Sequence, residues 1–428
     1  GRTAEANRAL GSVFRIYLGV GILACSALAI VSFTALDRFH IPAGRQGEAR
    51  LLLLLIALNF LVSFPLGVTR SVLAGLERFQ MLHGIEIGAA LFRLGAAAVL
   101  LEAGYGLVAL GGVQLVSSLL GHAVRAISLR RIAPEIHLTG GPGWQGFSPG
   151  IPIFSALSFG YESLRTLFDN ANLLFLGVLA GPGAVGLFGV AHTLASVVPK
   201  GLQPVSGVLF PMASRMEAQG RREDWARLLE VGTRLNLALA LPVVTLLAVE
   251  GEGFLRLWVG SGFQGSASLL AVLAVANLGA ASSLAATTLL FGSGRVGSLV
   301  WAEGVRYTMN LVLVLLLYRP LGLIGAGVAT LVSILVVDLW LVTRRACPRS
   351  GVAPRRFLLK SVAGPLLTGV PVAVLMMAWS RLFPGPTVPA LVLRCAFGLA
   401  GFALVYVLSG TFREERRLVG RAWAEVIR

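Results

Sequence analysis

Twelve apolar stretches of about 20 residues make up most of this sequence and leave few folds open to it. Their approximate cores are 13–36, 51–74, 82–101, 106–128, 151–180, 184–210, 231–249, 267–291, 298–317, 322–343, 358–379 and 388–409. A helix of about 20 apolar residues crosses the hydrocarbon core of a bilayer. Only 13% of the residues are charged, against roughly 25% in soluble domains. The sequence therefore predicts an all-α polytopic membrane protein with about twelve transmembrane helices.

The loops between these stretches alternate in basic charge along the chain. With residues 1–12 placed in the cytoplasm, the loops on that side hold 21 arginines and lysines, and the opposite loops hold 5. Basic loops stay on the cytoplasmic side of a membrane, so both ends of this chain are predicted to be cytoplasmic. The net charge of +16 is spread over short loops and forms no basic face on a soluble domain, which argues against nucleic acid as a partner.

An internal repeat relates two parts of the chain. Residues 75–131 and 292–345 share matched arginines, glutamates and glycines and a final basic pair, at an offset of about 217 residues. Duplicated bundles of apolar helices are common among membrane transporters. The second copy holds an even number of spans, so the repeat predicts two helical lobes of the same orientation with a cleft between them.

The repeat also predicts domain limits. Residues 1–10 align with 220–229, where the second copy has already completed two spans, so the first lobe is expected to lack its first two helices. We predict an incomplete N-terminal lobe of four spans at 1–131 and a C-terminal lobe of six spans at 140–345. An extra helix pair and a basic cytoplasmic tail follow at 346–428.

Charged residues in the middle of apolar stretches are the first candidates for function, because charge at a helix centre in a bilayer costs about 2.5–3.5 kcal/mol. Glu162, Arg165 and Asp169 lie near the middle of the stretch 151–180, and their spacing places them on one helical face. Such a face avoids lipid. It either lines the central cleft and meets a polar or anionic substrate, or it forms a structural ion pair that holds helices together.

Two further arginines lie within their stretches, Arg93 at the centre and Arg306 in the inner half, and do not match across the repeat. Arg93 lies in 82–101, and Arg306 follows Glu303 by three residues in 298–317. Guanidinium groups bind phosphate oxygens bidentately, so both arginines, with Glu303, are candidates for the substrate cleft. An ion pair within one helix is the equal alternative for Glu303 and Arg306.

The sequence contains no recognisable motif for binding a metal or a cofactor. Cys25, Cys347 and Cys395 have no paired spacing, and the five histidines form no HxxxH or HExxH pattern. No cofactor is therefore predicted. A membrane glycan polymerase or ligase would need a sizeable external loop or a catalytic constellation, and neither is visible, so we predict that the chain is not an enzyme.

A group of motifs between Leu164 and Pro211 carries a family resemblance. They are Asp169, Leu173–Gly177, Gly183–Phe188, Ala191 and Leu209–Arg215. With them the chain resembles the oligosaccharide flippase (polysaccharide transporter) family, which includes Wzx-type O-antigen flippases. That family shares a superfamily with multidrug/toxic-compound extrusion proteins and the lipid II flippase. Family members often have tyrosine where this chain has Phe188.

The resemblance implies a function. The chain would flip a lipid-linked oligosaccharide, with its glycan joined through pyrophosphate to a polyprenol, across the bacterial inner (cytoplasmic) membrane by alternating access. This transport would supply surface polysaccharide biosynthesis. Besides the lipid-linked oligosaccharide, the partners of the chain would be membrane lipids and polysaccharide assembly proteins. Coupling to Na⁺ or H⁺ fits this mechanism, and Asp169 or Glu162 would be the first carboxylate to test.

Two alternatives stay open. A multidrug or cation antiporter of the same fold would favour a carboxylate-rich, aromatic cavity, whereas the deep charges here are mixed and include Arg93, Arg165 and Arg306. The mixture favours an anionic substrate. The second alternative is a membrane scaffold that assembles other proteins without transporting anything.

Overall fold

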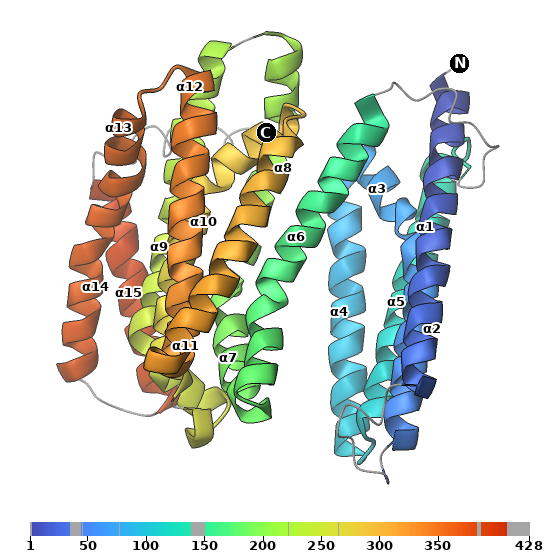
Figure 1. The fold of residues 1–428 in the computed structure, drawn as a ribbon, viewed down its shortest axis with the longest axis horizontal. Helices are drawn as coiled ribbons and strands as arrows, with labels where there is room; N and C mark the ends of the chain where they lie inside the picture. Colours follow the sequence, from blue (N-terminus) through green and yellow to red (C-terminus); the bar gives the residue numbers. More distant parts are fainter. Residues whose placement is uncertain are drawn as a thin grey trace. The chain divides into compact units, whose positions relative to one another are not determined.

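The structure is a computed structural model of the 428-residue chain. It describes residues 2–34, 44, 46–76, 78–137, 150–220, 222–263, 265–382 and 387–408. Within these ranges the chain is almost entirely helical (Figure 1), so the predicted all-α class is confirmed. Contacts divide the chain into two compact units, unit 1 (Gly1–Ile151) and unit 2 (Pro152–Arg428).

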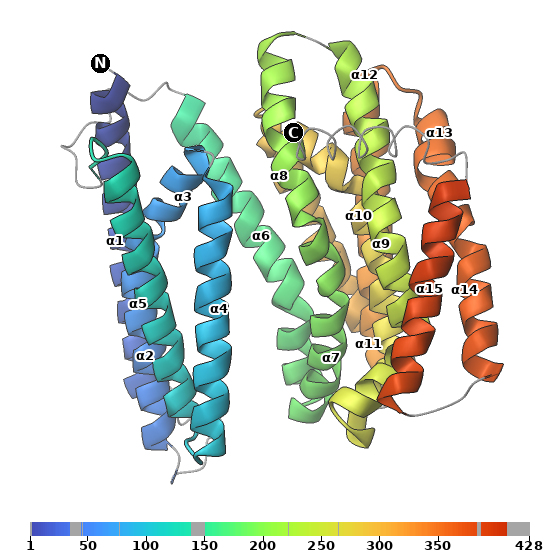
Figure 2. The same ribbon diagram turned by 180° about the vertical axis from the view of Figure 1, so that it is seen from behind.

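Unit 1 is a bundle of apolar helices. Its described helices are α1 (Arg2–Thr34), α2 (Gln46–Leu66), α3 (Val68–Gly75), α4 (Phe79–Glu102) and α5 (Leu107–Ile132). Helix α2 packs against both α1 and α5, and α4 packs on α5 (Figure 2). A Cβ atom at Gly111 would lie 2.6 Å from Cδ1 of Leu52. Glycine therefore permits the close approach of α5 to α2, as small residues commonly do between membrane helices.

Unit 2 is built around one central helix, α10. Its described helices are α6 (Gly150–Leu179), α7 (Pro182–Ala195), α8 (Val197–Ala218), α9 (Arg222–Trp258), η4 (Ser261–Phe263), α10 (Ser266–Gly292), α11 (Val296–Leu341), η5 (Val342–Ala346), α12 (Cys347–Ser350), α13 (Pro354–Phe357), η6 (Leu358–Ala363), α14 (Gly364–Leu382) and α15 (Val388–Leu408). Helix α10 contacts α7, α8, α9 and α11. It is rich in alanine, serine and glycine, which lets these neighbours approach closely.

Glycine and proline set the breaks between these helices. Gly181 has a φ of 80°, in the left-handed region that favours glycine, and Pro182 opens α7. The break between the predicted stretches 151–180 and 184–210 is therefore confirmed. Helix α11 runs over 46 residues, but Gly322 (φ 59°, ψ −139°) divides it into two halves just after Pro320.

Ten described helices are long and apolar enough to cross a membrane. Large apolar side chains lie exposed along many of them, as a lipid-facing surface requires. The chain is therefore a multi-pass membrane protein. Helix α11 counts once among the ten although it contains two predicted stretches, 298–317 and 322–343, and α6 is not among them. The number twelve stays a prediction.

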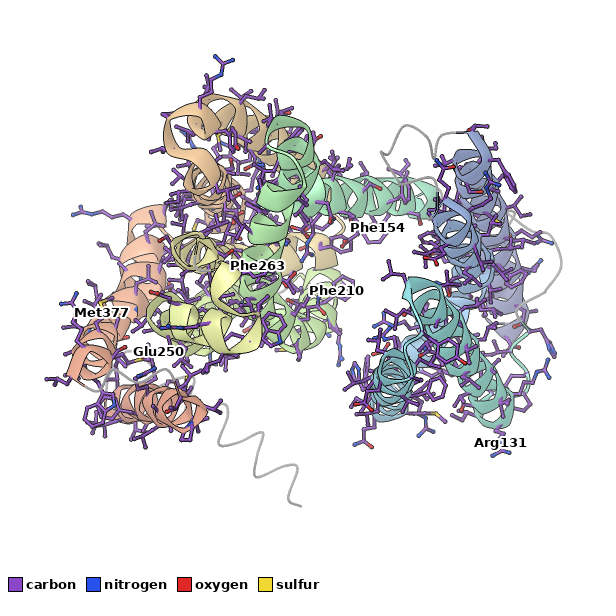
Figure 3. All side chains as sticks on the ribbon, turned by 90° about the horizontal axis from the view of Figure 1, so that it is seen from below. Arg131, Phe154, Phe210, Glu250, Phe263 and Met377 are labelled. Atoms are coloured by element: carbon purple, nitrogen blue, oxygen red, sulfur yellow. The ribbon has the colours of Figure 1, made fainter. Side chains whose placement is uncertain are left out.

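The two C-terminal helices, α14 and α15, pack on each other and on α9. Nε of Arg394 in α15 lies 2.8 Å from Oε2 of Glu250 in α9, and both side chains are buried. Figure 3 labels Glu250 on the side of α9 that faces α14 and α15. Trp379 also stacks on Phe397, with ring centroids 4.6 Å apart. The ion pair therefore links α15 to α9, and removal of one partner would leave a buried charge uncompensated at a cost of several kcal/mol.

Candidate functional site

Helix α6 carries Glu162, Arg165 and Asp169 on successive turns. Arg165 and Asp169 line a cavity of about 210 Å³ between α6, α8, α10 and α11, which we call the main cavity. Glu162 is exposed and does not line it. Arg165 lies within electrostatic range of both acids. Among the described residues, however, neither Arg165 nor Asp169 forms an ion pair or a hydrogen bond.

A second cavity of about 170 Å³ adjoins the main cavity. The two share lining residues, including Arg165, Asp169 and Asn277. The second cavity adds His192 of α7 and Lys200 of α8, whose Nζ donates a hydrogen bond to Oγ of the nearby Ser196 at 3.0 Å. Polar and charged groups from α6, α7, α8, α10 and α11 therefore face one connected space inside unit 2.

Arg306 lies between two carboxylates in the wall of the main cavity. Its Nη1 donates a hydrogen bond to Oε1 of Glu303 at 3.0 Å, and its Nη2 donates one to Oδ1 of Asp338. The side chains of Glu303 and Asp338 are only 5% and 1% exposed. The Arg306 guanidinium also lies over the ring of Phe168, 5.6 Å from its centroid. When all three groups are ionised, this cluster carries a net charge of −1.

Three buried polar atoms of the same cluster lack a hydrogen-bond partner within the described part of the chain. They are Nε of Arg306, Oε2 of Glu303 and Oδ2 of Asp338. A buried polar atom without a partner costs roughly 1–3 kcal/mol, and all three residues line the main cavity. No group of three or more metal-ligating side chains is found among the described residues.

A neutral polar network lies next to this cluster. Nδ2 of Asn172 in α6 donates to Oγ1 of Thr330 at 2.7 Å, and Nδ2 of Asn310 donates to Oδ1 of Asn172 at 2.8 Å. Asn310 and Thr330 belong to the two halves of α11, and all three side chains are buried. The network therefore joins α6 to both halves of α11 through well-satisfied hydrogen bonds.

Arg93 belongs to unit 1 and has a different environment. It is exposed at the middle of α4, where its Nη1 donates a hydrogen bond to Oε1 of Gln114 in α5 at 3.1 Å. Gln114 is neutral, so the charge of Arg93 is not compensated by this contact. An arginine at mid-span avoids lipid, and Arg93 is therefore expected to face water or an anionic group.

The structure brings together four of the six candidates predicted from the sequence. Arg165, Asp169, Glu303 and Arg306 all line the main cavity. Glu162 shares α6 with two of them, and Arg93 lies in unit 1. Contact of any of the six with a substrate stays a prediction.

The sequence reasoning missed Asp338, the second partner of Arg306, and the network members Asn310 and Thr330. Asp338 lies close to the end of the predicted stretch 322–343, where a charge commonly reaches toward headgroups. The sequence feature that could have identified Asp338 is that it is an acidic residue within a strongly apolar segment. Asn310 and Thr330 carry no charge, so they do not stand out in a search for deep charges.

The fold and the site define a polytopic helical membrane protein with a polar, charged cavity inside one of its units. Residues 2–268 match the family described as "Polysaccharide biosynthesis protein". This match covers more than half of the chain, which therefore belongs to that family. The predicted resemblance to the polysaccharide transporter family is confirmed by it.

A solved structure of similar fold is that of "Lipid II flippase MurJ, inward closed conformation". The similarity has a TM-score of 0.66, covers 97% of this chain and 85% of the MurJ chain, and comes with 15% sequence identity. At that identity the likeness establishes the fold. No curated protein sequence matches this chain.

Proposed function

We propose that this chain takes part in flipping a lipid-linked oligosaccharide across the bacterial inner membrane, with both of its ends in the cytoplasm, for surface polysaccharide biosynthesis. Its family and the fold that it shares with a lipid II flippase support movement of a lipid-linked substrate. The unpaired Arg165 on the wall of the main cavity carries the proposal. An arginine inside a membrane protein pairs with an anion or faces water, and a glycan linked through polyprenyl pyrophosphate supplies the anion.

The proposal gives the charged residues different roles. Arg165 binds a phosphate oxygen of the substrate, and Lys200 in the adjoining cavity adds a second cation. Arg306 is compensated by Glu303 and Asp338, so it holds the cavity wall in place. Amide groups such as Gln203 and Asn277 offer hydrogen bonds to sugar hydroxyls.

Transport through this site requires it to open. Cavities of about 210 and 170 Å³ are smaller than the roughly 300–1,000 Å³ typical of sites for drug-sized ligands. An oligosaccharide therefore enters only after the surrounding helices move apart. Rocking of helical bundles in alternating access provides such a movement in transporters built from repeats.

Asp169 is the residue that we assign to a coupling ion, Na⁺ or H⁺. It lies four residues from Arg165 on the same helix and shares both cavities with it. A cation bound at Asp169 would weaken the attraction between the carboxylate and the Arg165 guanidinium. The guanidinium would then be more available to a phosphate, which links ion binding to substrate binding.

A cation antiporter of the same fold is the competing function. The observation in its favour is the net charge of −1 on the Glu303–Arg306–Asp338 cluster in the cavity wall. Binding measurements on the purified protein separate the two. A polyprenyl pyrophosphate is expected to bind and an organic cation is not; the opposite result supports the antiporter.

Surface glycan export in the native host tests the proposal directly. We expect Arg165→Ala to lower export by about tenfold or more, because a lost charge-assisted hydrogen bond costs roughly 1.5–3 kcal/mol. Arg15→Ala is the matched control, since Arg15 is an exposed arginine of α1, and it should export normally. Normal export by Arg165→Ala at a normal protein level would contradict the proposed role.

A further inference from the structure

A separate basic pocket lies at one end of unit 2. It has a volume of about 270 Å³ and is lined by Glu217 at the end of α8, Trp225 of α9, Arg295 just before α11, and Pro348 and Arg349 of α12. Figures 1 and 2 both show α12 at the same end of unit 2 as the connection between α8 and α9. None of these residues lines the main cavity or the second cavity. We call it the Arg295–Arg349 pocket.

The pocket has more positive than negative charge. Nη2 of Arg295 lies 3.6 Å from Oε1 of Glu217, and both side chains are more than 40% exposed, so this pair is weak. Arg349 is partly buried, and within the described residues it forms neither an ion pair nor a hydrogen bond. Arg345 lies within electrostatic range of Arg349 and adds to the excess. The single carboxylate of Glu217 therefore does not balance the positive charge of Arg295, Arg345 and Arg349.

Packing holds the walls of the pocket in place. Trp225 is only 4% exposed and belongs to an apolar cluster that includes Cys347 and Phe357. The turn that precedes Arg295 is fixed to α8, because Oγ of Ser214 donates a hydrogen bond to the carbonyl oxygen of Gly292 at 2.9 Å. A pocket whose backbone and apolar wall are already in position loses less entropy when it binds a ligand.

An arginine near the end of a membrane helix commonly extends its side chain to headgroups or water. Arg344 fits that description, since it is exposed. Arg349 does not, because its side chain is partly withdrawn from water and lines a concave site in which it forms no ion pair or hydrogen bond with a described residue. A half-buried cation without a partner is costly, so the arrangement points to an acceptor that binds in the pocket.

We propose that the Arg295–Arg349 pocket binds the phosphate group of an anionic membrane lipid. Phosphate is the ligand that best matches forked guanidinium donors. The pocket lies at the ends of membrane-spanning helices, which is the level of lipid headgroups, and basic residues there attract anionic lipids by about 1 kcal/mol each. Its volume suits a headgroup better than a complete substrate. This site is independent of the main cavity and of the function proposed for it.

Lipid binding by the purified full chain tests the proposal. The protein is placed in nanodiscs of phosphatidylcholine, and binding of a fluorescent phosphatidylglycerol is measured. Arg349→Gln is expected to weaken binding about fivefold, whereas Arg344→Gln, which removes an exposed arginine outside the pocket, should weaken it less. Arg349→Lys should lie between them, because lysine keeps the charge and loses the fork.

A gain of binding provides a second readout that a misfolded protein cannot imitate. Glu217→Gln removes the carboxylate that competes for Arg295, so it should bind phosphatidylglycerol more tightly. Inorganic phosphate is tested in parallel as a competitor. If it displaces the lipid, and Arg349→Gln abolishes that effect, the pocket is a phosphate site for which lipid and soluble phosphate compete. Equal binding by the Arg349→Gln and Arg344→Gln proteins, or no gain in Glu217→Gln, would overturn the proposal.

Discussion

Two arginines at the middle of membrane helices, one in each unit, have opposite surroundings. Arg306 in unit 2 lies between Glu303 and Asp338, and its side chain is 13% exposed. Arg93 in unit 1 is exposed and contacts the neutral amide of Gln114. The same residue type at a similar depth in its helix is therefore compensated in one unit and uncompensated in the other.

The difference separates a residue whose charge is compensated within the protein from one whose charge is not. Arg306 links Glu303 in the first half of α11 to Asp338 in the second half, across the kink at Gly322. It contributes to the shape of the main cavity and has little charge left to attract a phosphate. Arg93 has no acid among its described contacts, so its charge can act on an incoming anion.

Removing the compensated arginine should have the largest effect. We expect Arg306→Ala to destabilise the protein by about 3–5 kcal/mol, because it leaves two buried carboxylates without a counter-charge. Thermal or denaturant unfolding of the purified protein in detergent measures this loss. The variant should also reach a lower level in the membrane.

A neutral version of the same cluster is the control. Arg306→Met combined with Glu303→Gln and Asp338→Asn removes all three charges and should recover most of the stability, since uncharged replacements of buried ion clusters are often tolerated. If Arg306→Ala were as stable as the unaltered chain, the cluster would not hold the two halves of α11 together. Arg306 would then belong with Arg93 as an available cation.

Interrupting the neighbouring neutral network should have a smaller effect. Asn310→Ala removes the partner of Asn172 and leaves a buried amide oxygen without its donor, at a cost of roughly 1–3 kcal/mol. Unfolding measurements should place this variant between the unaltered chain and Arg306→Ala. A cost as large as that of Arg306→Ala would show that charge is not what distinguishes the cluster from the network.

The sequence was sufficient to predict those features of the fold and the site that depend on the local pattern of residues. Apolar stretches predicted the helices because a chain in lipid satisfies its backbone hydrogen bonds within each helix. The Gly181-Pro182-Gly183 break follows from the backbone preferences of those residues. The spacing of Arg165 and Asp169 placed them on one face of α6, and both line the main cavity.

The Glu303–Arg306 pair within one helix was one of the predicted alternatives and is present, but partners that lie far apart in the sequence could not be predicted in the same way. Asp338 meets Arg306 because the two halves of α11 fold back on each other at Gly322, which lies midway between them in the sequence. That contact depends on the geometry of one kink, which residue spacing does not determine. The same holds for Arg349, whose missing acceptor becomes visible only when α8, α9 and α12 are seen to meet.

Giving Arg93 a carboxylate partner should make unit 1 resemble unit 2 and have the smallest effect on stability. In Gln114→Glu the new carboxylate takes the place of the amide that lies 3.1 Å from Arg93. An exposed ion pair contributes only about 0–1 kcal/mol to folding, so unfolding should change little. Glycan export should nevertheless fall by up to about fivefold, because Arg93 must give up a charged partner worth up to about 1 kcal/mol before it binds an anion. Gln114→Leu removes the amide without adding charge and should export normally, whereas equal export by the Glu and Leu variants would show that Arg93 does not act on the substrate.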